Sequence, residues 1–349
     1  LQALIEDRER NLLYDYRAPG EDAELALKPD CADLPYFLRA YFAWKLRLPF
    51  IYRMCTRGRK DTAPLCEPTV FSNLDSVPDK SDAAAFRRFA RRLANTVHSS
   101  SPRTLPGDDE TDFYPVRLRR QSMRPGTVYA DPYGHVLVVA RWKPQGVTDY
   151  GVLIGADAQP DGTVGRRRFW RGSFLFTPKS DLVGAGFKAW RPVQYDPSVL
   201  ETASPEGEAR RERAAKPEGR GGRTTGGGGR AALPDAGADT DTDTDTGADA
   251  GAGADTGADA DTDADADTGA GADAGAEAAP QPWRIASNQE LRDAKGIRAW
   301  SDVQYRGTAD DFYSAMEGII NPRPLDPVRM QVSLVDALEE SVQRRLSSV

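Results

Sequence analysis

Histidine and cysteine are scarce in this chain of 349 residues, which contains two His and three Cys. The usual zinc-ligand spacings are missing, as are a glycine-rich phosphate loop and a serine nucleophile elbow. No run of eighteen apolar residues is present, so the sequence predicts no membrane-spanning segment. A signal peptide can be neither recognised nor excluded, because the sequence begins at Leu1. These absences favour a function that needs no metal or other cofactor.

Acidic residues are concentrated in one segment. Residues 231–283 hold thirteen Asp, one Glu and no Lys or Arg, so they carry −14, and the remainder carries +7 within the net charge of −7. Residues 201–281 contain too few apolar side chains to offset the entropy of folding, which predicts a disordered linker. The alternating Asp residues lack the Gly and Glu of an EF-hand loop. The basic remainder could bind an acidic cell-wall polymer or the chain's own acidic segment.

Apolar residues at spacings of three and four predict amphipathic helices. We expect helices over residues 1–16, 34–46, 81–97 and 308–320, and from residue 333 onward. The predicted buried face of the second of these consists of Leu34, Phe37, Leu38, Tyr41, Phe42 and Leu46. Strands are predicted at residues 126–129, 136–142, 151–154 and 169–176, and residues 50–80 are predicted to form a loop. Helices followed by antiparallel strands indicate an α+β fold.

Three regions follow from these patterns. Residues 1–200 are predicted to form one domain, with an insertion at about residues 50–120. Residues 201–281 form the linker, and residues 282–349 a helical segment. Because the helices of this last segment are amphipathic, we expect them to pack on the first domain.

Cys31 precedes the clearest helix of the chain. Asp30 and Asp33 are both good N-cap residues, so the thiol is placed at or just outside the helix N-terminus. Only a thiolate attacks an acyl carbon, and a helix N-terminus favours the thiolate. A cysteine in this position is more often a small buried residue. Cys55 and Cys66 lie close together in the sequence, and if they form a disulfide, Cys31 is the free thiol.

His135 is the better of two candidates for the base beside that thiol. It opens an apolar strand directly after a Gly, whereas His98 ends a helix beside three serines. A third polar group would have to orient the imidazole. Asp157, just past the next predicted strand, is the first candidate for that role, and Asp131 and Asp149 are alternatives.

Two short blocks of sequence resemble the NlpC/P60 cell-wall hydrolases. Residues 30–34 read Asp-Cys-Ala-Asp-Leu, and the helix that follows ends in Leu-Arg-Leu-Pro; the family has Asp-Cys-Ser-Gly-Leu/Phe and a similar helix end. Residues 124–129 and 134–139 resemble its Pro-Gly-Asp-Leu-Val-Phe and His-Val-Gly-Ile-Tyr segments. The likeness implies a papain-like fold, with Cys31 as nucleophile and His135 as base. Asp157 would take the third position, which in the family is usually His, Asn or Gln.

The resemblance also implies a function. It points to a cysteine hydrolase that cleaves amide bonds in cell-wall peptides, with a peptide or peptidoglycan as partner and the cell envelope or the outside of the cell as location. The sequence departs from the family at Ala32, Asp33 and Thr127. The order Cys-His-Asp is also similar to that of transglutaminase-like acyl transferases. The alternative from another class is an inactive envelope or binding protein that retains the fold.

One basic stretch has a composition that is also found in nucleic-acid-binding proteins. Residues 166–171 interleave Arg with Phe and Trp, as nucleic-acid-binding surfaces do. A strand with its basic side in solvent explains the same pattern, and we expect that arrangement. No nucleic-acid partner is therefore predicted.

Overall fold

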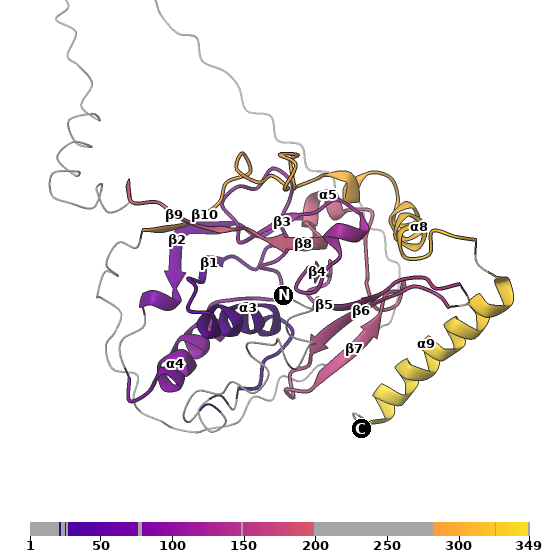
Figure 1. The fold of residues 1–349 in the computed structure, drawn as a ribbon, viewed down its shortest axis with the longest axis horizontal. Coiled ribbons are helices and arrows are strands. Elements are labelled where there is room, and N and C mark those ends of the chain that lie inside the picture. The colour runs from indigo at the N-terminus through magenta and orange to yellow at the C-terminus, as the bar shows by residue number, and fades with distance from the viewer. Residues whose placement is uncertain are drawn as a thin grey trace, which may run out of the picture. The chain divides into compact units, whose positions relative to one another are not determined.

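The computed structural model describes residues 21, 25, 27–75, 79–147, 149–198, 282–324 and 326–347 (Figure 1). They belong to one compact unit that combines residues 1–204 and 279–349. A second unit, residues 205–278, lies outside the described residues, as do the helix predicted over residues 1–16 and the linker predicted over 201–281. The described part mixes helices with antiparallel sheets, so the α+β prediction is confirmed.

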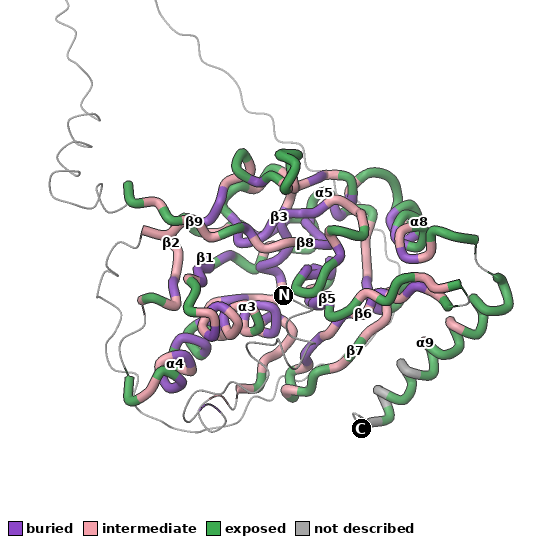
Figure 2. Tube along the Cα trace, viewed as in Figure 1, coloured by how far each residue is buried: buried purple, intermediate pink, exposed green. Residues whose placement is uncertain are grey.

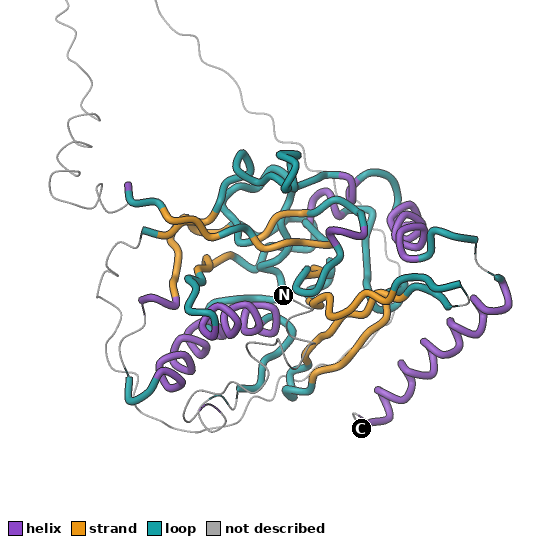
Figure 3. Tube along the Cα trace, in the orientation of Figure 1, coloured by secondary structure: helices purple, strands orange, loops and turns teal. Residues whose placement is uncertain are grey.

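The central element is a six-stranded antiparallel sheet (Figure 3). Its strands, in spatial order, are β3 (Phe113–Pro115), β8 (Gly186–Trp190), β4 (Val128–Ala130), β5 (Val136–Lys143), β6 (Val152–Ala158) and β7 (Val164–Arg168). Two smaller antiparallel pairs are β1 (Ile51–Cys55) with β2 (Cys66–Ser72), and β9 (Val193–Tyr195) with β10 (Trp283–Ile285).

Two helices pack together beside one face of the central sheet. They are α3 (Asp33–Lys45) and α4 (Asp82–Ala94), and α3 also contacts β5. Val128 and Val136 share a core with aromatic and small residues of these helices and of β1. The alternating side chains of the strands, Tyr129 and Leu137, lie in a separate core. The sheet is therefore buried on both faces at β4 and at the start of β5.

The prediction of α3 was correct in its bounds to within one residue and partly wrong in its buried face, of which Leu34 is buried as predicted. Tyr36, Ala40 and Ala43 are buried, whereas Phe37 and Tyr41 are only half-buried and Leu38 is exposed. The two alanines give the helix a narrow side that can lie close to its neighbours. The sequence pattern gave weight to the larger side chains, which lie at the rim of this contact.

Residues 282–324 cover the other face of the sheet. Their main helix, α8 (Ala309–Ile320), begins with the predicted capping box of Thr308 and Asp311. Phe312 is 2% exposed and its ring stacks on Phe176, with 3.9 Å between ring centroids. The C-terminal segment thus completes the core of the body formed by the first 200 residues.

The last helix, α9 (Pro327–Ser347), contacts β7 through a different face from the one its sequence suggests. Ser333 and Ala337 are half-buried, and the apolar residues are exposed (Figure 2). They are Val328, Met330, Val332, Leu334, Val335, Leu338, Val342 and Leu346. The expected packing of this apolar face against the first domain is not present. The remaining short helices are α5 (Ser180–Val183) and the 3-10 turns Asn73–Asp75, Arg120–Ser122 and Val303–Tyr305.

Two sequence-based predictions of strands and loops were wrong. Residues 50–80 contain the β1–β2 hairpin in place of a loop, because the short apolar start at Phe50–Tyr52 is enough to bury one strand. Residues 169–176 form turns, and the strand of this region is β7, directly before them. Phe169 and Phe174 reach the core from these turns.

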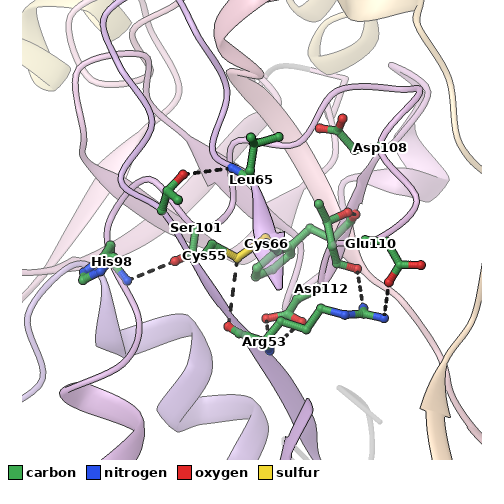
Figure 4. Close-up of a disulfide and its surroundings, with 12 residues drawn as sticks. Arg53, Cys55, Leu65, Cys66, His98, Ser101, Asp108, Glu110 and Asp112 are labelled. Carbon is green, nitrogen blue, oxygen red and sulfur yellow. Dashed lines mark hydrogen bonds and ion pairs between the residues drawn. A yellow bond between two sulfur atoms is a disulfide. The ribbon is translucent and has the colours of Figure 1, made fainter. Parts of the chain in front are cut away.

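Cys55 and Cys66 are cross-strand partners in the β1–β2 hairpin and form a disulfide (Figure 4). The backbone N–H of Arg53 donates to the buried carboxylate of Asp112 at 3.0 Å. The hairpin is thereby attached to the residues that lead into β3. Cys31 is the free cysteine.

Candidate functional site

Cys31 is the first residue of the helical turn that opens α3. The N–H of Leu34 donates to the backbone carbonyl of Asp30 at 3.1 Å, so helical hydrogen bonding begins at Asp30. The Asp30 carboxylate accepts from the N–H groups of Ala32 and Asp33 at 2.7 and 3.0 Å. The Asp30 side chain therefore caps N–H groups at the start of the helix. The N–H of Cys31 itself has no acceptor among the described residues.

His135 ends the turn that joins β4 to β5. The turn is closed by a hydrogen bond from the N–H of Asp131 to the carbonyl of His135, at 2.8 Å. Gly134 has a φ of 100°, a conformation that favours glycine and lets the chain reverse directly before the histidine. The His135 side chain is 31% exposed, so one side of the imidazole is open to solvent.

Asp157 lies near the end of β6 and contacts the imidazole directly. Its Oδ2 is 2.9 Å from Nε2 of His135, and its side chain is only 1% exposed. Nε2 is held by the carboxylate, and Cys31 lies near enough to the same ring to contribute to the raised pKa of the imidazole. The structure thus brings Cys31, His135 and Asp157, which lie far apart in the sequence, into one continuous row.

The charges of this row favour a protonated imidazole. Burial works against the charge of His135, but hydrogen bonds with Asp157 and Cys31 outweigh burial and raise its pKa to about 9. Burial likewise opposes the charge of Asp157, yet His135 and Arg167 lower the pKa of this carboxyl below its ordinary value. At neutral pH the row therefore contains an imidazolium and a carboxylate beside the thiol.

Such an arrangement can carry out nucleophilic acyl chemistry. An imidazolium and a helix N-terminus both favour the thiolate, the reactive form of cysteine. The N–H of Cys31 lies at the same helix start, where a backbone donor can stabilise an oxyanion. Cys31, His135 and Asp157 thus carry the groups that such chemistry needs: a thiol, an imidazole, a buried carboxylate and a backbone N–H at a helix start.

The alternatives to these residues lie elsewhere. Asp131 is next to His135 in the turn, but its carboxylate accepts from the N–H of Tyr133, and burial raises its pKa to about 6. Asp149 is exposed in the β5–β6 connection, where its carbonyl accepts from Gly146. The N–H of His98 donates to Ser101, and burial lowers the pKa of the His98 imidazole.

Sequence reasoning missed two residues that contact the row. Gln159 donates from Nε2 to Oδ2 of Asp157 at 2.9 Å, and Arg167 donates from Nε to the same oxygen. Gln159 is two residues after Asp157, a signal that could have been noticed. Arg167 lies within the basic run that was assigned to a solvated strand face, and only the pairing of β6 with β7 shows its contact.

Comparisons with protein-family models, with curated proteins and with solved structures found no match to this chain. Within the described ranges, no group of three or more His, Cys, Asp or Glu side chains is arranged to hold a metal ion. The described helices include none with both the length and the apolar character needed to cross a membrane.

Proposed function

We propose that this chain is a papain-like cysteine hydrolase that cleaves amide bonds in peptides of the cell wall. The observation that carries the proposal is the row of Cys31, His135 and Asp157, in which a buried carboxylate is hydrogen-bonded to the imidazole and the thiol lies close enough to raise its pKa. Its supports are a helix that presents the thiol and an antiparallel sheet that presents the other two groups. A helix packed on such a sheet is the arrangement that the papain-like proposal requires.

The mechanism begins with attack of the Cys31 thiolate on the carbonyl carbon of the amide. The carbonyl π electrons move to oxygen, and the N–H of Cys31 stabilises the resulting oxyanion. When the oxyanion collapses, the C–N bond breaks and the imidazolium of His135 gives its proton to the departing amine. The product of this half-reaction is a thioester on Cys31 and a neutral His135.

Water completes the cycle. Neutral His135 takes a proton from the attacking water, whose oxygen bonds to the thioester carbon. The C–S bond then breaks, and the acid product leaves with the thiolate and imidazolium restored. Asp157 remains ionised throughout and keeps the imidazole oriented through Nε2.

The choice of cell-wall peptides comes from the resemblance of residues 30–34 and 134–139 to the NlpC/P60 hydrolases. The excess of basic residues outside the segment 231–283 favours an acidic polymer as substrate. The geometry of Cys31, His135 and Asp157 supports the chemistry, whereas the choice of substrate is supported only by this resemblance and by the charge.

The test is digestion of purified peptidoglycan, with the released fragments identified by liquid chromatography and mass spectrometry. We expect the wild-type chain to release peptide fragments with new amino termini, and Cys31→Ala and His135→Ala to release none. His98→Ala is the matched control and should act like the wild type. Fragments released equally by Cys31→Ala would disprove the proposed nucleophile.

A second candidate is an acyl transferase similar to the transglutaminases. The observation that favours it is Asp157 as the residue on the imidazole, since the third residue of those proteins is Asp. The first half-reaction is the same, but an amine replaces water in the second. Adding a primary amine to the digestion and looking for its amide with the acyl fragment distinguishes transfer from hydrolysis.

A further inference from the structure

One oxygen of Asp157 receives three donors. Nε2 of His135, Nε2 of Gln159 and Nε of Arg167 all contact Oδ2, while Oδ1 is buried and has no hydrogen-bond partner among the described residues. A carboxylate that is 1% exposed needs a cation or several donors to remain ionised. Of the two cationic donors on Asp157, His135 and Arg167, Arg167 is the one whose charge does not change during the proposed reaction.

The register of β6 and β7 explains why Arg167 reaches this carboxylate. Asp157 is directly opposite Gly165, and Arg167 is directly opposite Gly155, so the two charged residues are diagonal neighbours on one face. A Cβ at Gly165 would lie 2.9 Å from Oδ1 of Asp157. The glycine therefore leaves the space in which the carboxylate lies between the imidazole and the guanidinium.

We propose that Arg167 is a positioning residue for the Cys31–His135 pair: its guanidinium fixes Asp157 as a carboxylate against Nε2 of His135, so that the imidazole faces the thiol. This inference rests on the proposed function for its catalytic meaning. The Arg167 side chain is 32% exposed at the outer side of the contact, so it reaches Asp157 from the protein surface. No contact between Arg167 and the substrate is required.

Several charged groups around the row must be considered in any titration. The imidazole of His135 interacts electrostatically with Cys31 at the start of α3, with Asp157 of β6 and with Asp131 of its own turn. Asp157 meets His135 from β5 and Arg167 from β7. Of these groups, Asp157 is the one that contacts Arg167 directly, so its protonation should respond most strongly to loss of the guanidinium.

The experiment follows the ring signals of His135 by NMR between pH 4 and pH 7 in the full chain without substrate. We compare the wild type with Arg167→Gln, with Arg167→Lys, and with Arg166→Gln as the matched control on the same strand. Removing the cation should raise the pKa of Asp157, because Arg167 is one of the groups that lower it. A new inflection should then appear in Arg167→Gln, be smaller in Arg167→Lys and be missing in Arg166→Gln.

Inflections caused by Asp131, whose pKa is about 6, are common to all four proteins and disappear in an Asp131→Asn background. A second measurement at pH 7 is the rate at which iodoacetamide alkylates Cys31. We expect Arg167→Gln to lower this rate about fivefold or more, since a carboxylate that moves away no longer supports the imidazolium. Arg166→Gln should leave the rate unchanged.

Identical titrations and identical alkylation rates for Arg167→Gln and the wild type would overturn the proposal. If Arg167→Gln does not fold, the same comparison is made with Arg167→Lys, which keeps the charge but not the planar donor geometry. Because neither measurement uses substrate, failure of the Arg167 proposal is separate from failure of the proposed hydrolase, which is judged on Cys31→Ala and peptidoglycan.

Discussion

Replacing Asp157 with Asn removes one negative charge from the row and keeps the shape of the side chain. In the folded chain the pKa of His135 is raised from 6.5 to about 9. A difference of this size corresponds to at most about 3 kcal/mol of folding free energy. The His135 side chain is 31% exposed and Cys31 supplies part of the effect. We therefore assign about 1–2 kcal/mol to the contact with Asp157.

The pH dependence has a definite sign. Because the folded pKa of His135 lies above its unfolded value, the stabilisation is complete below pH 6.5 and is lost as the pH rises through 9. The pKa of Asp157 is lowered, so its own contribution is lost only in acid. Guanidinium groups stay charged over this range. Loss of the Arg167 contact therefore changes the free energy of unfolding by the same amount at pH 6 and at pH 10. The destabilisation by Asp157→Asn at pH 6 minus that at pH 10 therefore reports the contribution of the charged His135.

The assay is urea unfolding of wild type and Asp157→Asn at pH 6 and pH 10, followed by tryptophan fluorescence. We expect the destabilisation by Asp157→Asn to be about 1–2 kcal/mol larger at pH 6 than at pH 10. Asp149→Asn, which changes an exposed aspartate, is the matched control and should show no such difference. NMR titration should also give a lower pKa for His135 in Asp157→Asn. Equal destabilisation at both pH values would refute the assigned charges.

Two further predictions concern the parts that support the site. Phe312→Ala should destabilise the chain by about 3–5 kcal/mol in urea unfolding, because the ring fills the core between α8 and the sheet. Val328→Ala changes a side chain that is 67% exposed and should alter the free energy of unfolding by less than about 0.5 kcal/mol. Similar changes for Phe312→Ala and Val328→Ala would contradict the conclusion that the C-terminal segment is part of the core. Asp30→Ala should lower the free energy of unfolding by about 1 kcal/mol and slow alkylation of Cys31. Asp30→Asn should retain most of the capping hydrogen bonds. Equal free energies of unfolding for the two variants would contradict the capping role of Asp30.

The sequence was sufficient to predict elements whose signals are local. The capping box at Thr308 and the helix that follows Asp30 are set by side chains within four residues of one another. The buried face of α3 could not be predicted, because Ala40 and Ala43 become core residues only when a neighbouring element lies against them. The strand β1 was missed for a similar reason, since its burial depends on contacts with α4 and β3.

The same distinction applies to the candidate site. Cys31, His135 and Asp157 were selected as a helix start, a strand start and a strand end, and the structure brings these three positions together. Arg167 could not be found in this way, because its role depends on the register of β6 and β7. Three consecutive arginines look alike in the sequence, and strand pairing determines which one faces Asp157.

The central claim is that Cys31 and His135 act as a nucleophile and its base, and alkylation of Cys31 tests it most directly. The chain is treated with iodoacetamide at pH 7 without reductant, and the modified residue is identified by peptide mapping. We expect labelling at Cys31 alone, at a rate about tenfold or more above that of His135→Ala and equal to that of His98→Ala. An unlabelled Cys31, or a rate unchanged by His135→Ala, would contradict the account.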